Sequence, residues 1–121
     1  MGNTKEFGNK GEDIAIDYLI QKGYIILERN FVSGKNEVDI IARNKGEVVF
    51  IEVKTRATSY FCEPEYAVKM DKQRAIIKVA NSYIFKNKVM EEARFDIISI
   101  IISDTETKVN HIERAFEPTL Y

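Results

Sequence analysis

Three ionisable side chains in one short stretch of the chain have the types and spacing that phosphodiester chemistry requires. Asp39 lies in the segment VDIIA, and Glu52 and Lys54 lie in the segment VVFIEVK. Both segments are rich in β-branched residues, which predicts two strands. Residues two apart on a strand point to the same face, so Glu52 and Lys54 are expected to project together.

A tight turn between these two strands sets their predicted register. The residues Asn44-Lys45-Gly46-Glu47 separate the strands, and this pattern is typical of a β-hairpin. With a loop of two or four residues, position 44 faces 47 and position 43 faces 48. Asp39 then lies opposite Glu52, with β-carbons about 4.5–5.5 Å apart, and Glu37 lies opposite Lys54. A loop of three residues would break this pairing.

Two opposed carboxylates repel one another unless something neutralises them. Mg²⁺ prefers oxygen ligands and takes one or two carboxylates from a protein, and a bound metal activates water for hydrolysis. Lys54 would then either stabilise the pentavalent phosphate or help to orient the nucleophile. The alternative is a solvated hairpin face with a Glu37–Lys54 ion pair. That alternative does not explain why both faces of the hairpin are largely apolar, through Val38, Ile40, Ala42, Val49, Ile51 and Val53 on one face and Ile41, Val48 and Phe50 on the other.

Composition places the chain among ordinary globular proteins. It has 121 residues, of which 45% are hydrophobic and 31% charged, and we predict one domain over 1–121 with a core over about 5–116. The single Cys62 excludes an intrachain disulfide. We see no signal peptide and no apolar run near 18 residues, so we expect a cytoplasmic protein without membrane contact. The net charge of −1 means that any nucleic-acid contact must come from a local patch.

The periodicity of apolar residues predicts the element order α-β-β-β-α-β-β. We expect a helix over 5–22 that stops at Gly23, a strand over 24–31, the central hairpin, a second helix that begins at Pro64 or at Asp71, and strands over 94–103 and 108–116. The nearly continuous apolar strand 94–103 is expected to be central, and the last strand to lie at an edge. This order predicts an α/β fold, with a mixed sheet flanked by helices.

Glu12, Gly8 and Gly11 are unusual residues in the first predicted helix. Glu12 lies at the edge of the apolar stripe, where it either extends into solvent or reaches the carboxylates of the hairpin. Each glycine weakens a helix by about 1 kcal/mol relative to alanine, so we predict that another segment approaches the helix closely there. Fraying of the first turn explains Gly8 equally well.

The second predicted helix is the most basic segment of the chain. Its cations form either a solvated face or a face that contacts phosphates, and we predict Arg56, Lys72 and Arg74 as nucleic-acid contacts. The loop from Ala57 to Glu63 is either a substrate-gripping flap with exposed aromatic residues or a segment whose aromatic residues are buried. The single histidine, His111, is expected to have a surface or packing role, and Cys62 has no neighbour that would make it a nucleophile.

The order of elements, with Asp39 followed by Glu52-Val53-Lys54, resembles the PD-(D/E)XK, or restriction-endonuclease-like, superfamily. The chain resembles more closely the YraN-like family of predicted bacterial endonucleases, through the segments GNKGEDIAIDYLIQKGYIILERN, EVDIIARN, VVFIEVKTR, ANSYI and ARFDIISI. The match covers roughly residues 7 to 102. The first helix also resembles that of archaeal Holliday-junction resolvases, through Glu12. Asn36 stands where the family more often has glycine, and Val38 stands where the superfamily motif has proline.

This resemblance implies a role for each matching residue. Asp39 and Glu52, with the backbone carbonyl of Val53, would bind Mg²⁺ or Mn²⁺. Lys54 would be the catalytic lysine, Glu12 a catalytic acidic residue that assists them, and Glu37 an auxiliary acidic residue.

Three hypotheses for function follow from the sequence. The first is a metal-dependent nuclease that acts on DNA rather than RNA, including branched or structured DNA. The second is a non-catalytic nucleic-acid-binding or adaptor domain that retains the fold, and the third is a protein-interaction module whose charges form structural ion pairs. A homodimer would suit an enzyme that cuts two strands, although no sequence feature demands one.

Overall fold

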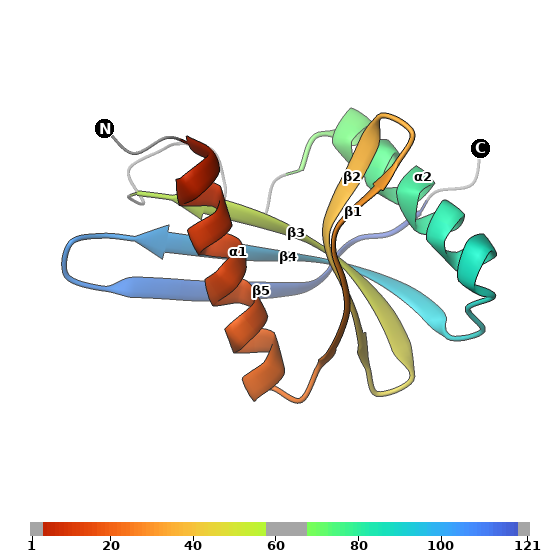
Figure 1. Cartoon of the computed structure of the whole chain (residues 1–121), viewed down its shortest axis with the longest axis horizontal. Helices are drawn as coiled ribbons and strands as arrows, with labels where there is room; N and C mark the ends of the chain where they lie inside the picture. The colour runs from red at the N-terminus through yellow and green to blue at the C-terminus, as the bar shows by residue number, and fades with distance from the viewer. Residues whose placement is uncertain (1–3, 58–67, 119–121) are drawn as a thin grey trace.

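A computed structural model describes residues 4–57 and 68–118, and these form two helices and five strands in the predicted order (Figure 1). The predicted flap, apart from Ala57, lies outside the described residues, and so does the alternative helix start at Pro64. The elements are α1 (Thr4–Gln21), β1 (Ile25–Ser33), β2 (Asn36–Asn44), β3 (Glu47–Arg56), α2 (Met70–Asn87), β4 (Glu92–Ile102) and β5 (Thr107–Phe116).

The five strands form one mixed sheet in the order β1-β2-β3-β4-β5. Strands β3 and β4 are parallel and are connected through α2, whereas the other neighbours are antiparallel. The α/β prediction is therefore confirmed. Strand β4 is interior and β5 lies at an edge, as the apolar content of each strand predicted.

The β2–β3 hairpin has the predicted register. Lys45 and Gly46 form a two-residue turn with φ angles of 49° and 82°, and positive φ at both positions suits the twist of a tight hairpin. Asn44 pairs with Glu47, and the recorded pairs continue to Ile40 and Ile51. The next positions along the two strands are Asp39 and Glu52. The predicted facing of Glu37 and Lys54 lies beyond the recorded pairs and stays a prediction.

The end of α1 has a local cause, whereas α2 begins without a side-chain cap. Helix α1 ends where Gly23 adopts a φ of 92°, and the Tyr24 N–H donates to the Leu19 carbonyl at 2.9 Å. Helix α2 begins at Met70 with Lys69 at the N-cap, so the alternative in which the helix begins with Asp71 as its N-cap was wrong. Asp71 lies in the first turn, where its carboxylate accepts a hydrogen bond from the Lys72 N–H at 2.9 Å. A carboxylate in the first turn still interacts favourably with the positive end of the helix dipole.

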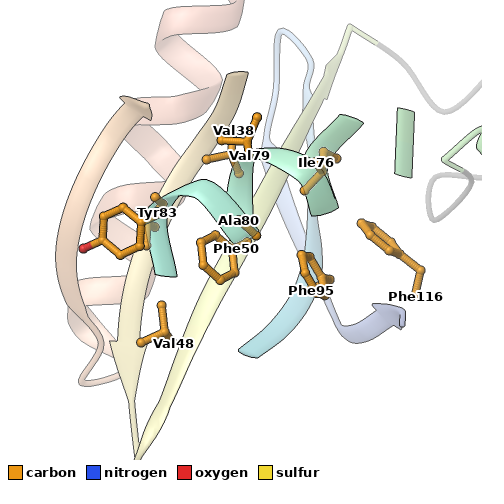
Figure 2. Packing of buried hydrophobic residues seen from close by; sticks show 10 residues of the cluster. Val38, Val48, Phe50, Ile76, Val79, Ala80, Tyr83, Phe95 and Phe116 are labelled. Carbon is orange, nitrogen blue, oxygen red and sulfur yellow. The ribbon is translucent and has the colours of Figure 1, made fainter. Parts of the chain in front are cut away.

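The sheet buries apolar residues on both faces. Figure 2 shows the face covered by α2, where Phe50, Phe95 and Tyr83 belong to one cluster. The other face packs against α1 through a second cluster that includes Ala15, Leu19 and Ile51. Helices on both faces hold the hairpin in place from two sides.

Val38 is an exception to the predicted alternation of faces. It packs with Ile41 in the α2 cluster, whereas Ile40 packs with α1, so the expected grouping of Val38 with Ile40 was wrong. Beyond Ile40, β2 has recorded pairs only with β1, and two-stranded ribbons twist more strongly than wide sheets. Figure 1 shows this ribbon curving toward α2.

Among the described residues, neither helix is long and apolar enough to cross a membrane.

Candidate active site

The predicted carboxylates lie where strands β2 and β3 stop pairing. Beyond the Ile40–Ile51 pair, Oδ2 of Asp39 accepts a hydrogen bond from the backbone N–H of Val53 at 2.8 Å. In a continued antiparallel ladder that N–H would be directed at a backbone carbonyl of β2. The Asp39 side chain therefore takes the place of a main-chain acceptor at the point where the strands separate.

Glu52 lies beside Asp39 and is poorly satisfied. Its side chain is 14% exposed, and Oε2 lies 3.5 Å from Nζ of Lys72 at the start of α2. Oε1 is buried and has no hydrogen-bond partner among the residues that the structure describes. A buried carboxylate oxygen without a partner is costly, so this site is not optimised for stability.

The pKa of Asp39 is raised to about 8, chiefly by burial and next by the negative charge of Glu52, with smaller contributions from the charge of Glu12 and from a side-chain hydrogen bond to Glu52. The hydrogen bond from Val53 opposes this shift because it stabilises the ionised form. The predicted repulsion between the two hairpin carboxyls is therefore present, although burial is the larger cause.

Glu12 approaches the carboxyl pair from α1. Its charge acts on Asp39, which favours the alternative in which Glu12 reaches the hairpin. Nε of Arg29 lies 3.3 Å from Oε1 of Glu12, and Nη1 of Arg29 lies 2.7 Å from Oδ1 of Asp13. Arg29 was not predicted as a residue of the site. Its signal was a lone cation within the apolar segment YIILERNF.

The close approach predicted at the helix glycines occurs at Gly11. A Cβ atom at Gly11 would overlap the side chain of Thr55, so only glycine fits there. Thr55 follows Lys54 on β3, and this contact therefore seats α1 directly against the strand that carries the candidate site. A Cβ atom at Gly8 would meet nothing within 4 Å, so no close approach occurs at that glycine.

The remaining predicted residues surround the carboxyl pair to different degrees. Lys54 and Arg56 are half-buried and follow Glu52 along β3 at alternate positions. Lys72 reaches Glu52, whereas Arg74 is exposed on α2. Glu37 is exposed and pairs across the strands with Val32 of β1.

The donor set fits a divalent cation that keeps much of its water. Among residues 4–57 and 68–118, no group of three or more His, Cys, Asp and Glu side chains is arranged to hold a metal ion. Asp39 and Glu52 nevertheless provide adjacent carboxylate oxygens, and Oε1 of Glu52 is buried with no hydrogen-bond partner in the part of the chain that the structure describes. Mg²⁺ commonly uses only one or two protein carboxylates, and it completes its coordination with water and substrate phosphate.

A second group of buried charges lies on the α1 face, and its role was not predicted. Asp96 is fully buried and accepts hydrogen bonds from Arg94 at 3.0 and 2.8 Å, from His111 at 2.7 Å and from the backbone N–H of Arg114 at 3.0 Å. Burial alone would raise the pKa of Asp96, but the hydrogen bonds from His111, Arg94 and the Arg114 backbone lower it below its ordinary value. Tyr24 accepts a further bond from Arg94.

His111 belongs to this second group. Its Nδ1 lies 3.1 Å from the hydroxyl of Tyr18, and its side chain is almost completely buried. Of the two predicted roles, packing is therefore confirmed and a surface position is wrong. The pattern of the sequence could not reveal the group, because its members come from α1, β4, β5 and the residue before β1.

The fold and the carboxyl pair define an α/β protein with a five-stranded mixed sheet and a candidate oxygen-donor site at the strand fork, the point where β2 and β3 stop pairing. The model of the family described as "Uncharacterised protein family UPF0102" matches residues 11–100. The chain is 44% identical over 121 residues, all of both chains, to a UPF0102 protein of Phocaeicola vulgatus. It is 45% identical over 118 residues to UPF0102 protein TTE1452 of Caldanaerobacter subterraneus subsp. tengcongensis, covering 94% of this chain and 97% of that protein. The chain belongs to the UPF0102 family.

Proposed function

We propose that this protein is a metal-dependent nuclease that hydrolyses phosphodiester bonds of DNA and has the restriction-endonuclease-like architecture. One observation carries the proposal, namely the Asp39–Glu52 pair at the strand fork. Its two carboxyls lie together. One has a strongly raised pKa, and the other has a buried oxygen with no hydrogen-bond partner within residues 4–57 and 68–118. Perturbed carboxyls of this kind are concentrated at functional sites.

Asp39 and Glu52 would hold Mg²⁺ or Mn²⁺, and the Val53 carbonyl is a third candidate ligand. Within a strand, the N–H and C=O of one residue point to the same side, so the Val53 carbonyl is directed to the side on which its N–H meets Asp39. When bound, such a cation supplies a nucleophilic water and stabilises charge on the phosphate. Glu12 adds negative charge beside Asp39, and Arg29 holds Glu12 in position.

Lys54 and Lys72 supply positive charge from two sides of the carboxyl pair. Lys54 projects from the same strand face as Glu52, and it would stabilise the charge that develops on the phosphate during hydrolysis. Lys72 neutralises part of the Glu52 charge in the free protein. A phosphate that entered the site would be attracted to the same ammonium group.

Cleavage of labelled DNA substrates with Mn²⁺ tests the proposal. Single-stranded, duplex, flap and four-way-junction DNA are compared for wild type, Glu52→Ala and Lys54→Ala, with Lys86→Ala at the far end of α2 as a control of matched charge. We expect wild type and Lys86→Ala to cleave at least one substrate and both site variants to lose at least about 100-fold in rate. Equal activity in the site variants would show that the cleavage comes from a contaminant.

Binding without cleavage would instead favour the non-catalytic adaptor. Among the described residues, no third His, Cys, Asp or Glu side chain is arranged with this pair to hold a metal ion, and this observation favours the second function. Electrophoretic mobility shifts with the same substrate panel distinguish the two functions, because an adaptor would bind DNA and leave it intact.

A further inference from the structure

A cavity of about 450 Å³ lies on the sheet beside the proposed active site. It lies over the end of β4 and the start of β5, and its lining residues are Ser99, Ile101, Lys108, Val109 and Asn110. In Figure 1 these strands continue past α1 on the side away from α2. Its volume falls within the range of pockets that bind small organic ligands, roughly 300–1,000 Å³.

The cavity and Glu52 lie on the same face of the sheet. Lys54 aligns with Ser99 across β3 and β4, and Ser99 aligns with Asn110 across β4 and β5. Aligned residues point to one side, and so do residues two apart on a strand, so this row lies on the face of Glu52. Ser99 is therefore one strand away from Lys54 and about 7 Å along the strand from the level of Glu52.

Within the described residues, the Ser99 hydroxyl is buried without a hydrogen bond. Ser99 is 1% exposed, and its Oγ has no hydrogen-bond partner among the described residues. A buried hydroxyl without a partner costs stability, since it has lost its bonds to water. At the floor of a cavity, such a group is an unused donor and acceptor for a ligand.

We propose that this cavity is a subsite for one nucleotide of the substrate strand, next to the nucleotide whose phosphate is cut. The proposal rests on the proposed nuclease function and extends it from phosphate chemistry to recognition of the strand. A nucleobase has apolar faces and a polar edge, and the cavity offers Ile101 to the faces and the Ser99 hydroxyl with the Asn110 amide to the edge.

Charge at the rim of the cavity suits a phosphate. Lys108 lines the cavity, and its Nζ lies 3.7 Å from the carboxylate of Glu106, with both side chains exposed. Exposed pairs of this kind contribute roughly 0–1 kcal/mol, so a phosphate readily replaces Glu106 as the partner of Lys108. Arg56 aligns with Ile101, which in turn aligns with Lys108, and this row extends the positive charge across the same face.

A scan with abasic sites tests the subsite. A fluorescent single strand carries one abasic nucleotide, which is moved along the strand, and binding is measured by anisotropy in EDTA so that no cleavage occurs. For wild type we expect one position at which the missing base weakens binding at least about fivefold, as loss of a single base contact would. In Ile101→Trp, which fills the cavity, and in Ser99→Val, which removes the hydroxyl, that position dependence should disappear.

Two controls separate folding and charge from recognition. Ser99→Val should leave Tm unchanged or raise it, because the hydroxyl that it removes has no hydrogen-bond partner among the described residues. A clear fall in Tm would contradict the assignment of Ser99. Lys108→Ala should weaken binding of the intact strand more than Lys86→Ala does, whereas equal losses would overturn the role of Lys108.

The outcomes also distinguish the subsite from the function on which it rests. If wild type binds and cleaves DNA but every abasic position has the same effect, the nuclease stands and the subsite is wrong. If wild type neither binds nor cleaves any member of the panel, the nuclease proposal fails and the subsite fails with it.

Discussion

Asp96 and Asp39 are aspartates on strands of one sheet, and their surroundings differ in kind. Asp96 accepts hydrogen bonds from Arg94, from His111 and from a backbone N–H, and its pKa is lowered. Asp39 accepts one bond from the Val53 N–H, lies beside a second carboxyl, and has a raised pKa. The same fold thus satisfies one buried carboxylate and leaves another in an unfavourable environment.

The difference indicates what each group contributes. The Asp96 group connects α1, β4 and β5 through Tyr18, His111 and Arg94, so it stabilises the packing of these three elements. The Asp39–Glu52 pair costs stability in the free protein, and local conflicts of this kind persist mainly at functional sites. Four changes test this contrast and the packing of α1 against the strand that carries Glu52, and they follow in order of decreasing expected effect.

Arg94→Met should have the largest effect on stability. It removes the cation from a fully buried Asp96, and breaking a buried ion pair from one side costs about 3–5 kcal/mol. Chemical denaturation measures the loss in the free energy of unfolding. Arg114→Met is the matched control, because Arg94 and Arg114 both form an ion pair with Glu47, at 3.2 and 2.7 Å. The side chain of Arg114 is 53% exposed, so its loss should cost less than about 1 kcal/mol. Equal losses would mean that the buried group has no special weight.

Gly11→Ala should destabilise the fold by about 2–3 kcal/mol, because the new Cβ overlaps Thr55 on β3. Gly8→Ala, three residues earlier on the same helix, should instead stabilise the protein by up to about 1 kcal/mol, since nothing lies near its Cβ position. Thermal denaturation of both variants measures the difference. A neutral Gly11→Ala would show that α1 does not seat against β3 as tightly as the structure indicates.

Asp39→Asn should stabilise the protein at high pH, by about 1–2 kcal/mol at pH 9. The amide oxygen still accepts from the Val53 N–H, and the repulsion with Glu52 is gone. In wild type the pKa of Asp39 is about 8 in the folded state, against about 3.9 in the unfolded state. At any pH between these two values, Asp39 is therefore protonated in the folded state and ionised in the unfolded state. Stability contributed by this group therefore falls as pH rises from 4 to 8.

The comparison of wild type with Asp39→Asn across pH 4–9 isolates this group from Asp96. The lowered pKa of Asp96 has the opposite sign, because its contribution is present at neutral pH and is lost as pH falls through the folded pKa. Both proteins should lose the contribution of Asp96 to stability at acid pH. Only wild type should show the decline between pH 4 and 8, and parallel curves for the two proteins would refute the raised pKa of Asp39.

Mn²⁺ should have the smallest of the four effects. At ten times its dissociation constant, a ligand that binds only the folded state stabilises it by about 1.4 kcal/mol. A rise in Tm with millimolar Mn²⁺ should occur in wild type and vanish in Asp39→Asn. Asp71→Asn, which alters an exposed carboxylate at the start of α2, should keep the rise. The same rise in all three proteins would place the metal elsewhere.

The sequence predicted the hairpin well because its determinants are local. The turn Asn44–Glu47 sets the register, and the alternation around it brings Asp39 and Glu52 to adjacent positions, as observed. The order of the elements followed for the same reason, since helical and strand periodicity are both short-range signals.

Other features depended on contacts that no local pattern encodes. The partners of Asp96 are its near neighbour Arg94 and residues of β5, and this arrangement depends on how the strands assemble. The packing of Val38 with α2 depends on the twist of the β1–β2 ribbon, and the position of Arg29 beside Glu12 depends on how α1 crosses β1. At α2, Asp71 was a plausible cap by residue type, but the chain enters the helix two residues earlier, at Lys69.

The hydrogen bond from the Val53 amide to Asp39 makes a backbone group sensitive to the state of the site. Protonation of Asp39, or its engagement by a cation, changes the acceptor that this amide faces. The Val53 ¹H–¹⁵N resonance is therefore a native spectroscopic probe, whose chemical shift and solvent-exchange rate should titrate with pH and with metal. The Asp96 group can be followed in parallel through the Arg114 amide, which donates to Asp96. The chemical shift of that amide should stay constant over the same range.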